Sequence, residues 1–174
     1  MHRDLKPQNL LIQENNIIKL AYFGLSRAFG IPLKAYTHEV ISLWYRPPEI
    51  LLGQKEYTTS VDIWSARCIF YEMLSGIALF RGDSEINQLN VIFSIMGSPS
   101  EDIWSGVSSL PFFDSSFPKY KRKAFEELIP SMNYQLIIDL INRMVVLDPK
   151  KRISARDALL HVLLTKPYFS DFDK

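Results

Sequence analysis

The stretch that decides how this sequence is interpreted lies near its start and reads His2-Arg3-Asp4-Leu5-Lys6-Pro7-Gln8-Asn9. It places a carboxylate, an ammonium and an amide in one short polar segment. The carboxylate of Asp4 can accept a proton from a hydroxyl held within hydrogen-bond distance. The amide oxygen of Asn9 suits magnesium, a hard cation that prefers oxygen ligands. Lys6 can face the same side as Asp4 if the loop is extended. A lone Asp-x-Lys would more often be a solvated polar turn, so the interpretation depends on the motifs that follow.

Four later motifs follow this stretch in a fixed order: Tyr22-Phe23-Gly24, Trp44-Tyr45-Arg46-Pro47-Pro48-Glu49, Asp62-Ile63-Trp64-Ser65 and Lys151-Arg152-Ile153-Ser154. Together with the first stretch they resemble the catalytic loop and the succeeding motifs of eukaryotic serine/threonine protein kinases. Three further segments narrow the resemblance to the cell-cycle branch of the cyclin-dependent kinases: 28–32, 36–40 and 82–86. The resemblance covers about residues 1–170.

The resemblance implies a mainly α fold, the large C-terminal lobe of a protein kinase, with a short β-hairpin next to the catalytic loop. The sequence contains no G-x-G-x-x-G and no V-A-I-K-type lysine, the elements that bind ATP in the N-terminal lobe of this family. We therefore expect a partial protein kinase domain over residues 1–170 that lacks the N-terminal lobe, followed by a tail at 171–174.

The sequence pattern itself predicts the elements of such a lobe. Short apolar runs around polar residues predict two strands joined by a turn, and apolar residues at helical spacing predict several helices. The predicted elements are strands at 10–12 and 17–20, a long ordered loop at 22–49, helices at 61–75, 84–96 and 134–147, an irregular segment at 98–122, and a last helix from 155 to about 164. Gly76 and Gly97 are expected to end the first two helices.

The composition is that of an ordinary globular protein, with 47% hydrophobic and 22% charged residues. The net charge of +1 gives no sign of a nucleic-acid or anionic-membrane partner. No apolar run reaches the length of a membrane span. The single cysteine, Cys68, cannot form an internal disulfide, which suits a reducing compartment. By resemblance we expect a cytoplasmic and/or nuclear protein.

The resemblance assigns roles in the active site. It implies that Asp4 accepts the proton of the substrate hydroxyl, that Lys6 steadies the transferring phosphoryl group of ATP, and that Asn9 binds magnesium. Ser42 stands where the family usually has threonine, and its hydroxyl is expected to bond Asp4 and Lys6. Thr37 is the expected regulatory phosphosite, and a phosphate there could pair with Arg3 and Arg27.

Four residues are assigned structural roles by the same resemblance: Arg3, Glu49, Asp62 and Arg152. Glu49 and Arg152 resemble the buried ion pair that ties the substrate-selecting segment to the lobe. Asp62 resembles the helix residue that accepts backbone N–H groups of the catalytic loop.

Two residues depart from the family pattern. Tyr22 replaces the aspartate that holds the metal between the phosphates. Because the metal's charge stabilises the transition state by several kcal/mol, and about 1.36 kcal/mol is tenfold in rate, we expect a loss of roughly a thousandfold or more. Arg67 replaces a glycine on the apolar side of the 61–75 helix. An unpaired guanidinium is costly to bury, unless the side chain reaches water along the helix surface.

The family transfers the ATP γ-phosphoryl group to serine or threonine followed by proline in protein substrates. The resemblance implies two partners: a cyclin, whose contact we expect to be largely lost in this chain, and a small accessory subunit that binds near the 83–96 region. We expect this chain alone to be inactive or severely impaired. Two alternatives stay open: a non-catalytic pseudokinase module that binds regulatory subunits, or a degenerate or truncated gene product.

Overall fold

The computed structural model describes residues 1–26, 43–128 and 135–165, and every structural statement below refers to these. The ordered elements are β1 (Leu10–Ile12), β2 (Ile18–Leu20), α1 (Pro48–Leu51), α2 (Ser60–Ser75), α3 (Glu85–Met96), α4 (Phe125–Leu128), α5 (Gln135–Met144), α6 (Ala155–Leu159) and α7 (Val162–Thr165). Short 3-10 turns lie at Pro7–Asn9, Phe23–Leu25, Leu43–Tyr45, Val107–Ser109 and Pro149–Lys151. The predicted mainly helical lobe with one small hairpin is confirmed.

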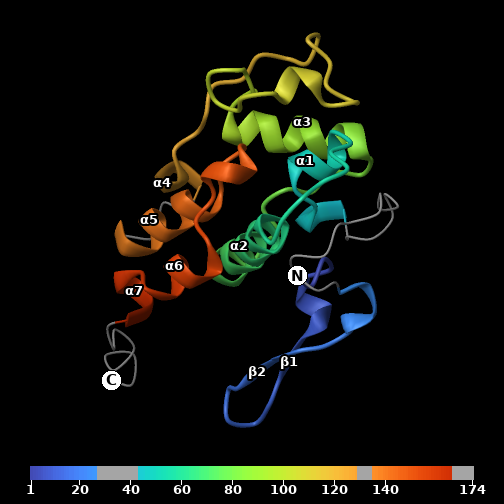
Figure 1. Cartoon of the computed structure of the whole chain (residues 1–174). Helices are drawn as coiled ribbons and strands as arrows, with labels where there is room; N and C mark the ends of the chain where they lie inside the picture. The colour runs from blue at the N-terminus through green and yellow to red at the C-terminus, as the bar shows by residue number, and fades with distance from the viewer. Residues whose placement is uncertain (27–42, 129–134, 166–174) are drawn as a thin grey trace.

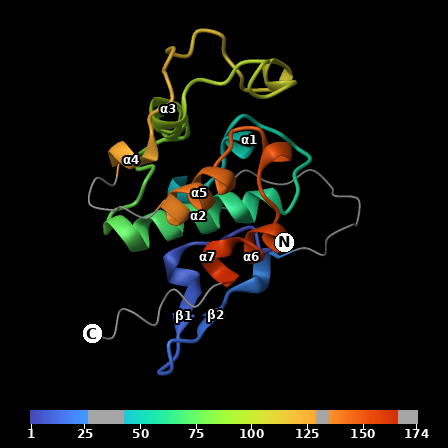
Figure 2. The same cartoon turned by 90° about the vertical axis from the view of Figure 1, so that its left-hand side faces the viewer.

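Helix α2 is the centre of the lobe (Figures 1 and 2), with α3 on one side of it and the hairpin on the other. Helix α5 packs beside α2, and α1 packs on α3. Trp64 of α2 is fully buried and its ring stacks on Phe80 at 5.4 Å between centroids. The sequence predicted that this helix is buried, because it is apolar on most sides. In the structure neighbouring segments cover it from several directions. It ends at Gly76, whose φ of 75° is the left-handed conformation that glycine adopts without strain.

The hairpin forms as predicted, with β1 and β2 antiparallel and Leu10 paired with Leu20. It extends away from the helices (Figure 1). Leu10 packs against the main core, whereas Leu11, Ile12 and Ile18 are exposed. A two-stranded sheet with so little cover has little stability of its own.

Helix α3 begins one residue later than predicted, because Ser84 is its N-cap and accepts a hydrogen bond from the Asn87 N–H at 3.3 Å. At its C-terminal end Gly97 has a φ of 83°, and a Cβ at this position would lie 3.0 Å from the backbone N of Arg122. Glycine therefore allows the chain around residue 122 to approach α3 closely.

Three further predicted elements differ from the structure. The loop predicted over 22–49 contains the start of α1, because Pro47-Pro48 suits a helix N-terminus. Helix α5 ends at Met144 rather than at 147. The last helix is broken into α6 and α7 at His161, whose Nδ1 accepts the N–H of Leu163. Among the described helices, none combines the length and the hydropathy that a bilayer span requires.

Candidate active site

Hydrogen bonds attach the catalytic-loop residues to the N-terminal end of α2. The carboxylate of Asp62 accepts the backbone N–H of His2 and that of Arg3, each at 2.7 Å. Arg3 has a φ of 72°, a strained conformation for a non-glycine residue. The two charge-assisted bonds from Asp62 offset this strain. The predicted contact between Asp62 and the loop is therefore present.

Asp4, Lys6 and Asn9 are brought together as predicted. Asp4 is 8% exposed, and its Oδ2 lies 3.0 Å from the Lys6 Nζ. The Asn9 Nδ2 donates to the same Oδ2 at 3.0 Å and to the Asp4 backbone oxygen at 2.6 Å. These contacts fix the orientation of a carboxylate, so a hydroxyl placed against it would meet a positioned proton acceptor.

Tyr22 follows a residue that contacts this cluster in the fold, since the Ala21 N–H donates to the Asn9 backbone oxygen at 3.0 Å. Its φ of 65° is left-handed and its side chain is 70% exposed. The following Phe23 packs edge-on against His2 at 5.0 Å. The local turn is therefore formed, with a neutral, solvent-exposed phenol in place of a carboxylate.

These residues do not fit a complete magnesium site. Magnesium requires near-octahedral oxygen ligands that usually include one or two carboxylates. Asn9 can offer one oxygen, whereas the Asp4 Oδ2 already accepts from both Lys6 and Asn9 and Tyr22 supplies no charge. Within the ranges that the structure describes, no group of three or more His, Cys, Asp or Glu residues is placed to hold a metal ion.

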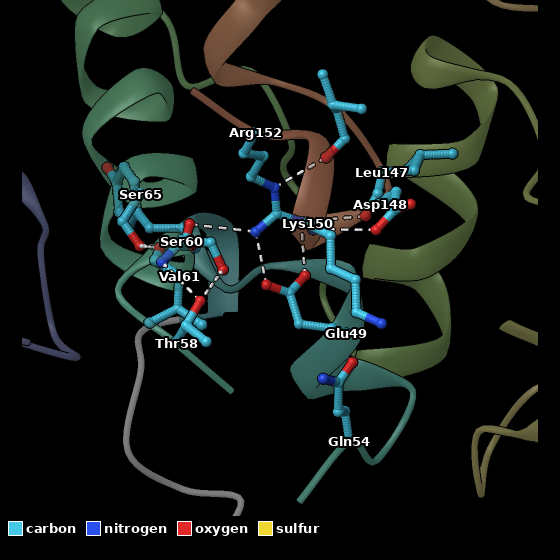
Figure 3. Close-up of polar contacts among 12 residues, drawn as sticks. Glu49, Gln54, Thr58, Ser60, Val61, Ser65, Leu147, Asp148, Lys150 and Arg152 are labelled. Atoms are coloured by element: carbon cyan, nitrogen blue, oxygen red, sulfur yellow. Dashed lines mark hydrogen bonds and ion pairs between the residues drawn. The ribbon is translucent and has the colours of Figure 1, made fainter. Parts of the chain in front are cut away.

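Glu49 and Arg152 form the predicted ion pair (Figure 3). Both side chains are fully buried, and the guanidinium is bidentate, with Nη1–Oε1 at 2.5 Å and Nη2–Oε2 at 2.6 Å. Arg152 also donates to the backbone oxygens of Ser60, Val146 and Leu147, and it lies 4.8 Å over the ring of Trp64. One arginine thus holds α1, α2 and the segment after α5 together.

Sequence reasoning missed the contacts that fix residues 43–46. The Trp44 Nε1 donates to the Gly82 oxygen at 2.9 Å, the Tyr45 hydroxyl donates to Glu72 at 2.7 Å, and Arg46 pairs with Glu85 at 2.5 Å. Burial, followed by the Glu72 carboxylate, raises the pKa of Tyr45 far above its usual value. The charges of Arg46 and Glu85 were visible in the sequence, but no local pattern pairs two residues so far apart.

Arg67 is the second departure from the family pattern. The alternative that its side chain reaches water along the helix surface is wrong. The side chain is 0% exposed, and burial lowers the pKa of its guanidinium to about 9. The predicted roles of Thr37 and Ser42, with Arg27, fall on residues 27–42, outside the described residues, as does the predicted boundary at 170 between domain and tail.

One comparison with known families bears on this site. The family model described as "Protein kinase domain" matches residues 1–164, which include the Asp4 cluster, the Asp62 anchor and the Glu49–Arg152 pair. Domains of this family use ATP and magnesium. Because the match spans most of the chain, this protein belongs to the protein kinase domain family.

Proposed function

We propose that this chain is the substrate-side lobe of a cyclin-dependent-type serine/threonine protein kinase in which phosphoryl transfer is abolished or severely impaired. Its reaction class by descent is transfer of the ATP γ-phosphoryl group to serine or threonine before proline. The positioned Asp4 carboxylate and the Glu49–Arg152 scaffold support descent from an active enzyme.

The impairment of phosphoryl transfer is inferred from Tyr22. The turn of Tyr22, Phe23 and Gly24 is built beside the catalytic loop, yet its first residue offers an exposed phenol. A neutral phenol cannot replace the charge that a carboxylate contributes to binding a magnesium ion. We therefore propose that Tyr22 removes magnesium binding from this site and leaves the proton acceptor, Asp4, in place.

The test compares the wild-type chain with Tyr22→Asp and with Tyr22→Asn. Asparagine has nearly the shape of aspartate but carries no charge. We expect magnesium to raise the Tm of Tyr22→Asp, and to leave the Tm of the wild type and of Tyr22→Asn unchanged. Equal responses of the Asp and Asn variants would show that the missing carboxylate is not the limiting feature.

A transfer assay addresses the activity directly. The chain is incubated with radiolabelled ATP, magnesium and a Ser-Pro peptide, with Asp4→Asn as the control. We expect no transfer above that control. Transfer by the wild type that Asp4→Asn abolishes would overturn the proposal.

A second candidate function is a non-catalytic binding module, and the surface at α3 favours it. A groove of about 690 Å³ lies between α1, α3 and residues 112–118. Ile86 and Phe112 line it and are 69% and 54% exposed. Since exposed apolar residues around a groove are typical of protein interaction sites, we propose a small accessory subunit of the cyclin-dependent family as its partner.

Capture of purified accessory subunit by the immobilised chain tests this second function. Binding should survive Asp4→Asn and be lost in Ile86→Asp. Ile77→Asp is the matched control, because Ile77 is also exposed, at 52%, and does not line the groove. A chain that neither binds the subunit nor transfers phosphate would support the third reading, a degenerate or truncated product. A cyclin partner and residence in the cytoplasm or nucleus are proposed from the family resemblance alone.

A further inference from the structure

Arg67 is a buried cation with no polar partner among the described residues. All three of its guanidinium nitrogens lack a hydrogen-bond partner among the described residues, and its side chain is 0% exposed. Its neighbours are aromatic, with the guanidinium carbon 4.1 Å from the centroid of the Phe125 ring and 5.9 Å from that of Phe80. A guanidinium carries five N–H donors, so the closed structure leaves a large hydrogen-bonding demand unmet.

The electrostatic surroundings make this burial less favourable. Contact with aromatic faces returns part of the lost hydration energy, but an unpaired buried charge remains destabilising. Burial lowers the pKa of Arg67 most, and among its neighbours Arg122 also lowers this pKa, whereas Cys68 and Tyr71 act in the opposite direction. The structure described, which we call the closed state, therefore buries Arg67 at a cost in free energy.

One side of Arg67 is covered by a segment whose hydrogen bonds to the lobe lie mostly near its start. Residues 119–128, which we call the strap, run from the end of α3 to α4 along the edge of the lobe (Figures 1 and 2). Hydrogen bonds hold the start of the strap to the lobe: the Ser98 N–H donates to the Tyr120 backbone oxygen at 3.0 Å, the Tyr120 N–H donates to the Ser98 Oγ at 2.8 Å, and the Lys123 N–H donates to the Ile95 backbone oxygen at 2.9 Å. The Arg122 guanidinium also donates to the Asn142 Oδ1 at 2.7 Å. At the other end of the strap, the Tyr71 hydroxyl reaches the Leu128 oxygen only at 3.4 Å.

The other aromatic neighbour is held more firmly. Phe80 is fully buried and stacks on Trp64, which is itself buried under Arg152. Helix α2, which carries Arg67, is long and packs against α5. Of the described elements around Arg67, the α4 end of the strap is therefore the one with the fewest hydrogen bonds to the rest of the lobe.

We propose that the strap opens locally from the folded lobe, and that hydration of Arg67 drives this opening. In the closed state Phe125, 1% exposed, seals the guanidinium. In the open state Arg67 gains water, and the rings of Phe80 and Phe125 become accessible on the uncovered face. Opening of this kind occurs below the threshold of global unfolding.

Hydrogen exchange followed by mass spectrometry tests the proposal on the whole chain under native conditions. The probes are peptides that cover residues 120–128, with α3 as the internal reference. Arg67→Met keeps a long apolar stem and removes the charge. We expect it to slow exchange of the strap relative to α3 by about tenfold or more, which corresponds to roughly 1.4 kcal/mol. Because the readout is a ratio within one molecule, a gain in global stability alone does not produce it.

Two further variants test the direction of the effect and its specificity. Arg67→Lys keeps the charge and loses the planar stacking on Phe125, so the strap should exchange faster than in the wild type. Arg143→Met removes an exposed cation that pairs with Asp139 and should leave the ratio unchanged. The proposal fails if Arg67→Met leaves the ratio of strap to α3 exchange at its wild-type value, or if Arg143→Met changes it as much.

Discussion

Removing the charge of Glu49 should destabilise the whole lobe. In Glu49→Gln, Arg152 keeps its three backbone acceptors but loses a carboxylate that accepts from two of its nitrogens at 2.5 and 2.6 Å. Both side chains are 0% exposed, so water cannot replace the lost partner. Breaking a buried ion pair in this way costs about 3–5 kcal/mol, which is a large part of the roughly 5–15 kcal/mol that stabilises a typical domain.

Urea denaturation of the full chain measures this cost. The double variant Glu49→Gln/Arg152→Met should lose less free energy of unfolding than the sum of the two single variants, because it leaves no charge buried alone. Glu14→Gln, in the exposed hairpin turn, is the control and should change stability by less than about 0.5 kcal/mol. A loss below about 1 kcal/mol in Glu49→Gln, or strict additivity in the double variant, would refute the reasoning from burial.

Three other perturbations have expected outcomes. Asp62→Ala removes the acceptor of two backbone bonds and should cost about 3 kcal/mol in urea denaturation, with faster exchange of the His2 and Arg3 amides; unchanged exchange would contradict the anchoring role. Tyr22→Asp should change the free energy of unfolding by less than about 0.5 kcal/mol, because the side chain is exposed and aspartate tolerates a left-handed φ. Arg67→Met should be more stable than the wild type at pH 7. The folded-state pKa of Arg67, about 9, lies below its ordinary value, so above pH 9 the unfolded chain binds more protons than the folded chain and wild-type stability rises with pH. The advantage of Arg67→Met should therefore shrink above pH 9, and an advantage that stays constant to about pH 10 would contradict the burial of a charged guanidinium.

The sequence predicted elements whose signals are local. The hairpin, α2 with Gly76 and α3 with Gly97 each have an apolar pattern and a matching end signal within a few residues. Helix α5 was predicted too long because buried apolar residues continue past its end at Val145 and Leu147. There the oxygens of Val146 and Leu147 accept from Arg152, a contact that no periodicity reveals.

The site was predictable only where a motif carried it. Asp4, Lys6 and Asn9 were expected to meet because they share one short loop, and the structure brings them together. The neighbours of Arg67 could not be predicted, since Phe80 and Phe125 come from distant parts of the chain. The break at His161 was also invisible, because it depends on a bond from its Nε2 to Asp139 on α5.

The hairpin has a consequence for how the protein behaves at high concentration. In a two-stranded sheet both strands are edges, and each offers unpaired backbone groups to another chain. Lys19 is the only charged side chain on β1 and β2, while Leu11, Ile12 and Ile18 are exposed around it. Contact between copies should therefore begin at this hairpin, so that light scattering by concentrated solutions depends on Lys19. A second charge at Ile12 would reduce self-association without reaching the helical core.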